Sequence, residues 1–282
     1  MKDYISKLLL KLIADKEFTQ IRYFFKKKKK LNLINPETFS EKVNFVKLYS
    51  DNPLRVLVAD RLKVREFVSS KNTLCKVVPI LWNGKVLKKL DFDLLPKQFV
   101  IKANHGSKMV ALINKDQHSF DYVKGLIQAW LKRDYYALGR EKVYKDLERY
   151  IVIEKKLELQ SGNIPQDFKF FCFDGKVELV EVDSDRFILH TRNFYDRSFN
   201  YLDIKCMFPN GEVLAKPIQF ETAVEIAERL SEDFSFIRVD LYLLDDGSVY
   251  FGELTNYHGN GFETFTPESY DLYLGSLIKK LY

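Results

Sequence analysis

The chain has 282 residues, 46% of them hydrophobic and 15% aromatic, which is enough for one large core or two closely packed ones. Its 45 Lys and Arg outnumber its 39 Asp and Glu to give a formal charge of +6, part of it in the single run Lys26 to Lys30. The charge is nearly balanced elsewhere, which argues against nucleic-acid binding. Three widely separated cysteines without C-x-x-C spacing argue against a zinc site and suit a reducing cytosol.

The segment 1–30 carries apolar residues at helical spacing with lysines between them, which predicts two short amphipathic helices. The acidic Asp3 makes this segment a poor signal peptide. No stretch of the sequence approaches the roughly 18–20 uninterrupted apolar residues of a transmembrane helix. Two interpretations of the basic run stay open: in-plane contact with an anionic membrane, or a helix packed on the domain with an exposed lysine edge.

Helical signals continue along the chain. Asn35-Pro36 predicts a turn, Ser40 is expected to cap the helix that follows, and a further helix is expected over 60–68. The apolar face of the helix that begins near Ser40 would be formed by Val43, Val46 and Tyr49.

Strand signals dominate from residue 77 onward. Single strands are predicted over 77–82, 99–102, 109–113, 150–153 and 187–194. Two hairpins are predicted, 168–173 with 176–182 over Asp174-Gly175, and 236–243 with 248–253 over Asp245-Asp246-Gly247. Helices are predicted over 119–131, over 223–230 and at the C-terminus. Because helices come first and antiparallel hairpins later, the expected fold class is α+β.

The first candidate binding cluster is a strand that ends at Lys102 and opens into the loop His105-Gly106-Ser107. A lysine charge, loop N–H groups and the Ser107 hydroxyl would suit a triphosphate. The P-loop consensus G-x-x-x-x-G-K-[ST] is absent, and a lysine before a Gly-containing hairpin is common in proteins without a nucleotide. This cluster is therefore not diagnostic by itself.

The second cluster lies on the second predicted hairpin. Alternation along a strand places Arg238 and Asp240 on one face, and the hairpin brings Glu253 beside them. Converging carboxylates repel each other unless a cation such as Mg²⁺ lies between them, and Arg238 would stabilise a phosphoryl group or an oxyanion. The alternative is a cross-strand salt bridge between Arg238 and Glu253 on a solvated face. Apolar residues on both strands indicate that the hairpin is buried, which disfavours charged side chains that have no function there.

Two further segments carry weaker signals. The apolar strand that ends at Glu154-Lys155 would present backbone groups to an adenine edge, with Leu157 packed on the ring. The alternative is an ordinary strand that leaves the core. Asp167 and Lys169 alternate to one side of their strand, where an acceptor would suit ribose hydroxyls and a surface ion pair is the simpler interpretation.

The order of these clusters resembles that of the ATP-grasp superfamily, and most closely that of the TupA-like ATP-grasp family, named for a teichuronopeptide biosynthesis protein. The resemblance covers roughly residues 30–280, and the joint order of its short motifs argues against chance agreement. The matching motifs are Asn35-Pro36 with Phe39 to Lys42, Asp60-Arg61 with Val64 to Glu66, Ile101 to Ser107, Arg140-Glu141, Asp167 to Phe170 with Cys172 to Lys176, Arg238 to Tyr242, and Phe251 to Thr255.

The resemblance implies a role for each residue of a nucleotide site. Lys102 would grip the α- and β-phosphates, and Ser107 would lie in the loop that closes over the triphosphate. Glu154 would accept a hydrogen bond from the adenine amino group, the next residues would offer backbone contacts to the ring, and Asp167 would bind the ribose. The implied ATP-binding set is Lys102, His105, Gly106, Ser107, Glu154, Lys155, Leu157, Asp167 and Lys169.

For the reaction centre, the resemblance implies that Asp240 and Glu253 hold Mg²⁺ and that Arg238 steadies an acyl phosphate and a tetrahedral intermediate. Superfamily members often carry Glu-x-Asn at this point, whereas Leu254-Thr255-Asn256 follows Glu253 here. The third metal ligand therefore stays open between Thr255 and Asn256. Arg61 stands where an ATP-contacting lysine is usual, and His105 and His258 fall beside the expected site, where a proton-transfer role for either is open.

The resemblance also implies the ATP-grasp fold, in which two α+β subdomains enclose the nucleotide. The expected divisions are an N-terminal helical region over 1–50, a first subdomain over 51–98, the small lid subdomain over 99–156 and the large subdomain with the Mg²⁺ site over 157–282.

The implied function is an ATP-dependent, ADP-forming carboxylate–amine ligase of capsule or other cell-envelope polysaccharide biosynthesis. Its partners would be a glycan, or a nucleotide- or lipid-linked sugar acid, and an amino acid or another amine. It would act in the cytoplasm, with residues 1–30 in peripheral contact with the inner membrane face. Three alternatives remain: a polysaccharide-biosynthesis glycosyltransferase, an ATP-dependent glycan phosphotransferase and a non-catalytic nucleotide-binding scaffold. The identity of the nucleotide product would distinguish them.

Overall fold

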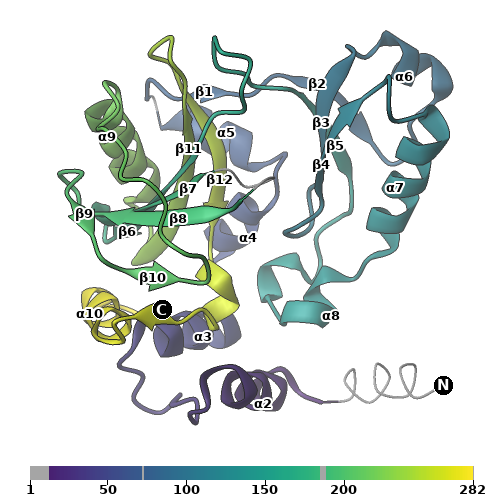
Figure 1. Ribbon diagram of the computed structural model, residues 1–282. Coiled ribbons are helices and arrows are strands. Elements are labelled where there is room, and N and C mark those ends of the chain that lie inside the picture. The colour runs from purple at the N-terminus through teal and green to yellow at the C-terminus, as the bar shows by residue number, and fades with distance from the viewer. Residues whose placement is uncertain (1–12, 72, 185–188, 282) are drawn as a thin grey trace.

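The computed structural model describes residues 13–71, 73–184 and 189–281, which form two main sheets with helices around each (Figure 1). The first predicted helix lies before residue 13 and is therefore outside the described residues. In sheet order, the large sheet consists of β1 (Lys76–Val77), β12 (Val249–Thr255), β11 (Phe236–Leu243), β6 (Asp167–Phe173), β7 (Lys176–Ser184), β8 (Thr191–Tyr195) and β9 (Tyr201–Leu202).

The small sheet has four antiparallel strands, and its first strand continues from the chain that forms the edge of the large sheet. In sheet order it consists of β2 (Ile80–Gly84), β5 (Ile151–Lys155), β3 (Gln98–Ala103) and β4 (Val110–Asn114). Helices α6 (Lys89–Leu94) and α7 (Phe120–Lys132) cover one of its faces, and α8 (Tyr135–Gly139) and η1 (Lys142–Tyr144) follow α7.

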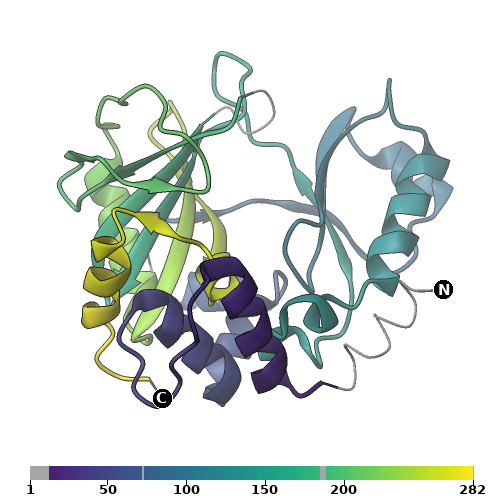
Figure 2. The same ribbon diagram turned by 60° about the horizontal axis from the view of Figure 1, so that its bottom comes forward.

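The remaining helices lie around the large sheet (Figures 1 and 2). They are α2 (Asp15–Lys27), α3 (Phe39–Tyr49), α4 (Pro53–Ala59), α5 (Val64–Ser70), α9 (Phe220–Ser231), η2 (His258–Gly261) and α10 (Ser269–Leu277), with the short pair β10 (Lys205–Cys206) and β13 (Phe265–Thr266) beside α10. Separate helices and mainly antiparallel strands confirm the expected α+β class. No helix in the described ranges combines the length and the apolar character that crossing a bilayer requires.

Alternation along the central strands separates the core from a polar face. On β6, Phe168 and Phe170 pack in the cluster under α9, whereas Phe171 packs in a second cluster with Phe39 of α3. Further along that second face, the residues are charged and no longer apolar. They are Lys169 on β6 and Asp240 on the neighbouring strand β11, which is the register partner of Lys169. One face of one sheet is thus core at one end and a charged site at the other.

Several sequence predictions need correction. Thr38, and not Ser40, caps α3: its hydroxyl accepts from the Glu41 backbone N–H at 3.2 Å in a capping box, while Ser40 binds Asp271. Tyr49 is 41% exposed and does not share the buried face of α3. The strand predicted over 77–82 is split between two sheets, because Pro79 has no N–H with which to continue a ladder.

The subdomain boundary expected between residues 98 and 99 would assign strands of one sheet to two subdomains. Strand β2, from the segment 51–98, belongs to the same sheet as β3, β4 and β5. The strand predicted over 187–194 is observed over Thr191–Tyr195, and residues 185–188 are outside the described ranges. Helices α4, α6 and α8 were not predicted; each has at most seven residues, too few to show a clear helical period.

Replacing Phe39 should test the packing of α3 on the site-bearing face. Its ring is 1% exposed and lies edge-on to Phe236 at 4.8 Å. We expect Phe39→Ala to lower the free energy of unfolding by about 3–5 kcal/mol, because a buried ring is lost and a cavity remains. The matched control Phe25→Ala removes a ring that is 66% exposed and should change it by about 0.5 kcal/mol or less. Equal effects of both variants in urea denaturation would contradict the assignment of this core.

Candidate functional site

A cavity of about 560 Å³ lies between the two sheets and receives side chains from both. Five of the predicted site residues line it: Lys102, Ser107 and Glu154 from the small subdomain, and Arg238 and Glu253 from the large sheet. The described residues around it include eight basic and four acidic side chains, so the cavity is suited to a polyanion. The structure therefore brings the lysine strand and the carboxylate hairpin to one space.

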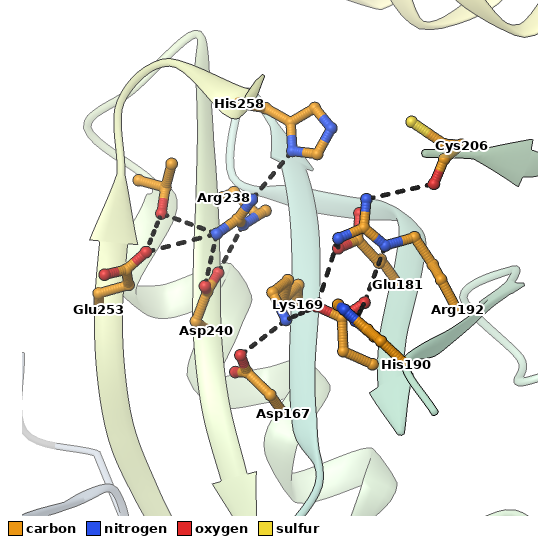
Figure 3. A network of polar contacts seen from close by, with 12 residues as sticks. Asp167, Lys169, Glu181, His190, Arg192, Cys206, Arg238, Asp240, Glu253 and His258 are labelled. Atoms are coloured by element: carbon orange, nitrogen blue, oxygen red, sulfur yellow. Dashed lines mark hydrogen bonds and ion pairs between the residues drawn. The ribbon is translucent and has the colours of Figure 1, made fainter. Parts of the chain in front are cut away.

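Arg238 is the centre of the large-sheet side of this site (Figure 3). Its Nε and Nη2 donate to the two oxygens of Asp240 at 2.7 and 2.6 Å, and Nη2 also lies 3.4 Å from Oε1 of Glu253. Asp240 and Glu253 are register partners on β11 and β12, so both carboxylates meet one guanidinium. The expected convergence of the two carboxylates is observed, and in this structure Arg238 supplies the positive charge between them.

The electrostatic environments of the two carboxylates differ. Burial raises the pKa of Asp240, and the adjacent Arg238 charge opposes that rise. Burial alone would also raise the pKa of Glu253, but the charges of Arg61 and Arg238 outweigh it and lower this pKa to about 2. Two carboxylates that meet at one point are the kind of donor set that Mg²⁺ prefers, and Arg238 occupies the position between them here.

The two candidates for a third metal ligand point in different directions. Thr255 lines the cavity, and its hydroxyl donates to Oε1 of Glu253 at 2.8 Å. Asn256 is buried away from the cavity, where its side chain both accepts from and donates to Arg55. Consecutive strand residues face opposite sides, so the geometry favours Thr255.

On the small-sheet side, Lys102 and Glu154 form an ion pair of 2.6 Å across β3 and β5. Arg65 of α5 approaches the same carboxylate at 3.3 Å, and both cations line the cavity. Lys102 thus lies where it was expected relative to the cavity. The carboxylate of Glu154, expected at the adenine amino group, is held by these two cations.

Four predicted nucleotide-site residues belong to the small subdomain or the chain after it but do not line the cavity. His105 is packed inward with Nε2 at 3.1 Å from the Trp130 carbonyl oxygen, and burial lowers its pKa. Gly106 lies so close to the Tyr135 ring that an added Cβ would be 2.4 Å from it. Lys155 is exposed and Leu157 is partly buried. Their predicted roles in ATP binding remain predictions.

Asp167 and Lys169 lie on the site face but beneath its surface (Figure 3). Lys169 is held by Asp167 at 2.7 Å and by Asp183 at 2.8 Å, and Asp183 in turn binds Arg192. The pair is buried, which excludes the surface ion pair considered from the sequence. Lys169 is also the register partner of Asp240, so a chain of alternating charges extends from the carboxylate pair across the sheet.

Arg61 joins the two halves of the site, which sequence spacing alone did not indicate. Its guanidinium donates to the carbonyl oxygens of Ala103 and Gly106 at 2.8 and 2.7 Å, and to Oε2 of Glu253 at 3.0 Å. It therefore connects the backbone of the predicted phosphate loop to a predicted metal ligand. The only sequence signal was its place where a lysine is usual in the resembled family.

His258 supports Arg238 from the side opposite to Asp240. Its Nδ1 lies 2.9 Å from Nη1 of Arg238, and Nε2 lies 2.9 Å from Oε2 of Glu263. Because arginine has only donors, Nδ1 must be the acceptor, which places the ring proton on Nε2 toward Glu263.

Cys206, His258 and Glu263 are also close enough to hold a metal. Only one of these three groups is a carboxylate, whereas Mg²⁺ prefers oxygen ligands, so we assign no Mg²⁺ there.

The family model described as TupA-like ATPgrasp matches residues 41–279. Similar solved structures include D-alanine–D-alanine ligase from Bacillus anthracis in complex with ATP, with 14% identity and a TM-score of 0.43 over 71% of this chain and 54% of that one. N5-carboxyaminoimidazole synthetase from Staphylococcus aureus in complex with ADP has 16% identity and a TM-score of 0.44 over 71% of this chain and 45% of that one.

The chain thus spans about half the length of these solved structures. Among curated protein sequences, none is significantly similar to it. The family match extends over most of the chain and includes Lys102, Arg238, Asp240 and Glu253. This chain belongs to the TupA-like ATP-grasp family.

Proposed function

We propose that the protein is an ATP-dependent carboxylate–amine ligase that forms ADP. The observation that carries this proposal is one cavity lined by Lys102 of one sheet and by Arg238 and Glu253 of the other. Asp240 is buried and does not itself line the cavity, but Arg238 binds it directly. A triphosphate between these sheets would exchange the internal ion pairs of Lys102 and Arg238 for phosphate oxygens. The family membership supports the same assignment.

Different residues of the cavity would have different roles in the reaction. Lys102 and the Ser107 loop would bind phosphate oxygens, with Arg61 keeping the loop backbone near Glu253. Asp240 and Glu253 would hold Mg²⁺, which neutralises phosphate charge when bound. Arg238 would stabilise the charge that develops when the substrate carboxylate attacks phosphorus and when an amine adds to the acyl phosphate.

We further propose that the carboxylate belongs to a sugar acid of cell-envelope polysaccharide biosynthesis and that the reaction takes place in the cytoplasm. The family name supports the pathway, and three free thiols without a disulfide suit a reducing compartment. An ATP-dependent glycan phosphotransferase would use the same nucleotide site, but it would leave the phosphoryl group on the glycan. A glycosyltransferase would consume a nucleotide sugar in place of ATP.

The nucleotide product and a trapped acyl phosphate test this proposal together. With Mg²⁺, ATP, hydroxylamine and either D-glucuronate or UDP-glucuronate, we expect ADP, free phosphate and a hydroxamate, because hydroxylamine attacks an acyl phosphate. Chromatography and a colorimetric hydroxamate assay measure these products. ADP with a phosphorylated sugar and no free phosphate would support the phosphotransferase, and UDP without ADP would support the glycosyltransferase.

Lys102→Ala should weaken binding of the ATP analogue AMP-PNP with Mg²⁺ by roughly tenfold or more, because a charged hydrogen-bond donor to phosphate is lost. The matched control is Lys97→Ala, since Lys97 lies just before the same strand but is exposed and paired with Asp116. Isothermal titration calorimetry measures both affinities. An unchanged dissociation constant for Lys102→Ala would remove this lysine from the nucleotide site.

Glu253→Gln should lower turnover by roughly 10²-fold or more while AMP-PNP still binds at high Mg²⁺, because one of two proposed metal ligands loses its charge. Glu225→Gln, on the exposed face of α9, is the matched control and should retain wild-type turnover. Raising the Mg²⁺ concentration should partly restore the activity of Glu253→Gln. Full activity at low Mg²⁺ would contradict the metal assignment.

A further inference from the structure

Part of the cavity is bordered by helix α2, which has no part in the nucleotide site described above. Arg22 and Lys26, one helical turn apart on α2, both line the cavity. Helix α2 lies below the space between the two subdomains and beside α8 (Figures 1 and 2). Next to Arg22 the lining continues with Leu138 of α8 and Phe262 after η2. The N-terminal helix therefore completes the cavity.

Arg22 is held in place by its apolar and backbone neighbours. Its Nη1 donates to the Leu138 carbonyl oxygen at 2.5 Å, and its guanidinium lies over the Phe262 ring at 4.9 Å from the centroid. Within the described ranges, no carboxylate lies at ion-pair distance from Arg22 or Lys26. Among the other six basic residues of the lining, four are paired with carboxylates, namely Arg61, Arg65, Lys102 and Arg238. Lys108 and Arg133 form no ion pair within the described ranges.

Other lysines of the basic run 26–30 form ion pairs within the protein and do not line the cavity. Lys27 forms a buried ion pair with Asp271 at 3.0 Å and donates to the Glu263 carbonyl oxygen, and Lys29 pairs with Glu268. The run is thus not one uniform basic face for a lipid surface. Lys26 is directed to the cavity and Lys27 to the protein interior, as adjacent positions on a helix require.

A buried carboxylate lines the same cavity as the α2 cations and the reaction centre. Glu141 lines the cavity, is 7% exposed, and interacts electrostatically with both Arg22 and Glu253. Burial raises its pKa, with the charges of Lys47 and Arg22 opposing that rise. Glu141 is therefore a negative group that takes up a proton more readily than an ordinary glutamate.

We propose that this part of the cavity binds the amine substrate, and that this substrate is an amino acid whose carboxylate is held by Arg22 and Lys26 and whose ammonium group faces Glu141. The inference rests on the proposed ligase function. Two cations and one buried carboxylate in the same cavity match the two opposite charges of a zwitterion. A neutral amine would leave both cations uncompensated.

The proton balance follows from this arrangement. The ammonium group passes one proton to Glu141, and the free amine then forms a C–N bond to the acyl carbon. The C–O bond to the phosphate breaks as the tetrahedral intermediate collapses, and the phosphate departs with the electron pair. The second amine proton leaves with the phosphate, and Glu141 returns its proton to water.

Binding of amino acids tests the proposal without turnover. The wild-type protein with saturating AMP-PNP and Mg²⁺ should bind at least one of glycine, L-alanine and L-glutamate, and should bind its α-carboxamide roughly tenfold or more weakly. Lys26→Gln and Arg22→Gln should each weaken the amino acid and leave the AMP-PNP affinity unchanged. Lys30→Gln, an exposed lysine of the same run, is the matched control and should change neither affinity.

Different results separate this inference from the proposed function. Absence of AMP-PNP binding in the wild type would overturn the ligase proposal itself. Normal AMP-PNP binding without binding of any of the amino acids, or equal binding of acid and carboxamide, would overturn only the amino acid subsite. If Lys26→Gln instead weakens flotation with phosphatidylglycerol vesicles and leaves amino acid binding intact, the α2 cations serve a lipid surface and the proposal fails.

The role of Glu141 is tested by changing the nucleophile. Hydroxylamine is uncharged at neutral pH and needs no proton acceptor before it attacks. We expect Glu141→Gln to lose about 10²–10⁴-fold in amide formation with the amino acid and to keep near wild-type hydroxamate formation. Equal loss in both reactions would contradict a role in deprotonating the amine and indicate a structural role.

Discussion

One guanidinium holds the site together. Arg238 contacts both Asp240 and Glu253 in a largely buried environment, where two carboxylates without a positive neighbour would repel each other strongly. The same group is fixed from its other side by His258, which is itself held by Glu263. Arg238 thus balances the charge of the carboxylate pair in this structure.

A second arginine links this pair to the other sheet. Arg61 binds the carbonyl oxygens of Ala103 and Gly106, at the end of the lysine strand, and also the carboxylate of Glu253. The two subdomains meet at the cavity through polar contacts such as those of Arg61, and Val143 also joins an apolar cluster of the large sheet. A polyanion that enters between them would compete for the same cations, which couples its binding to the relative positions of the subdomains.

Much of the fold could be predicted because local signals were strong. Hairpins with Asp-Gly turns and long amphipathic helices have clear periods, and the facing of Arg238 and Asp240 follows from strand alternation. The contributions of Arg22 and Glu263 to the cavity could not be predicted, and Glu141 appeared only within the motif Arg140-Glu141, without a role. These residues come from three separate segments that tertiary packing brings together. Their spacing in the sequence does not indicate that they are close in space. The split of the strand at Pro79 could be predicted from the sequence, because proline has no N–H with which to continue a ladder.

The most direct test is a crystal structure with AMP-PNP and Mn²⁺, in which anomalous scattering locates the metal. If the two carboxylates form the cation site, Mn²⁺ is bound by Asp240 and Glu253, and the guanidinium of Arg238 has moved from between them toward the phosphates. Nucleotide bound between the sheets with the Arg238–Asp240 pair intact and Mn²⁺ elsewhere would contradict the assignment of this pair as the metal site.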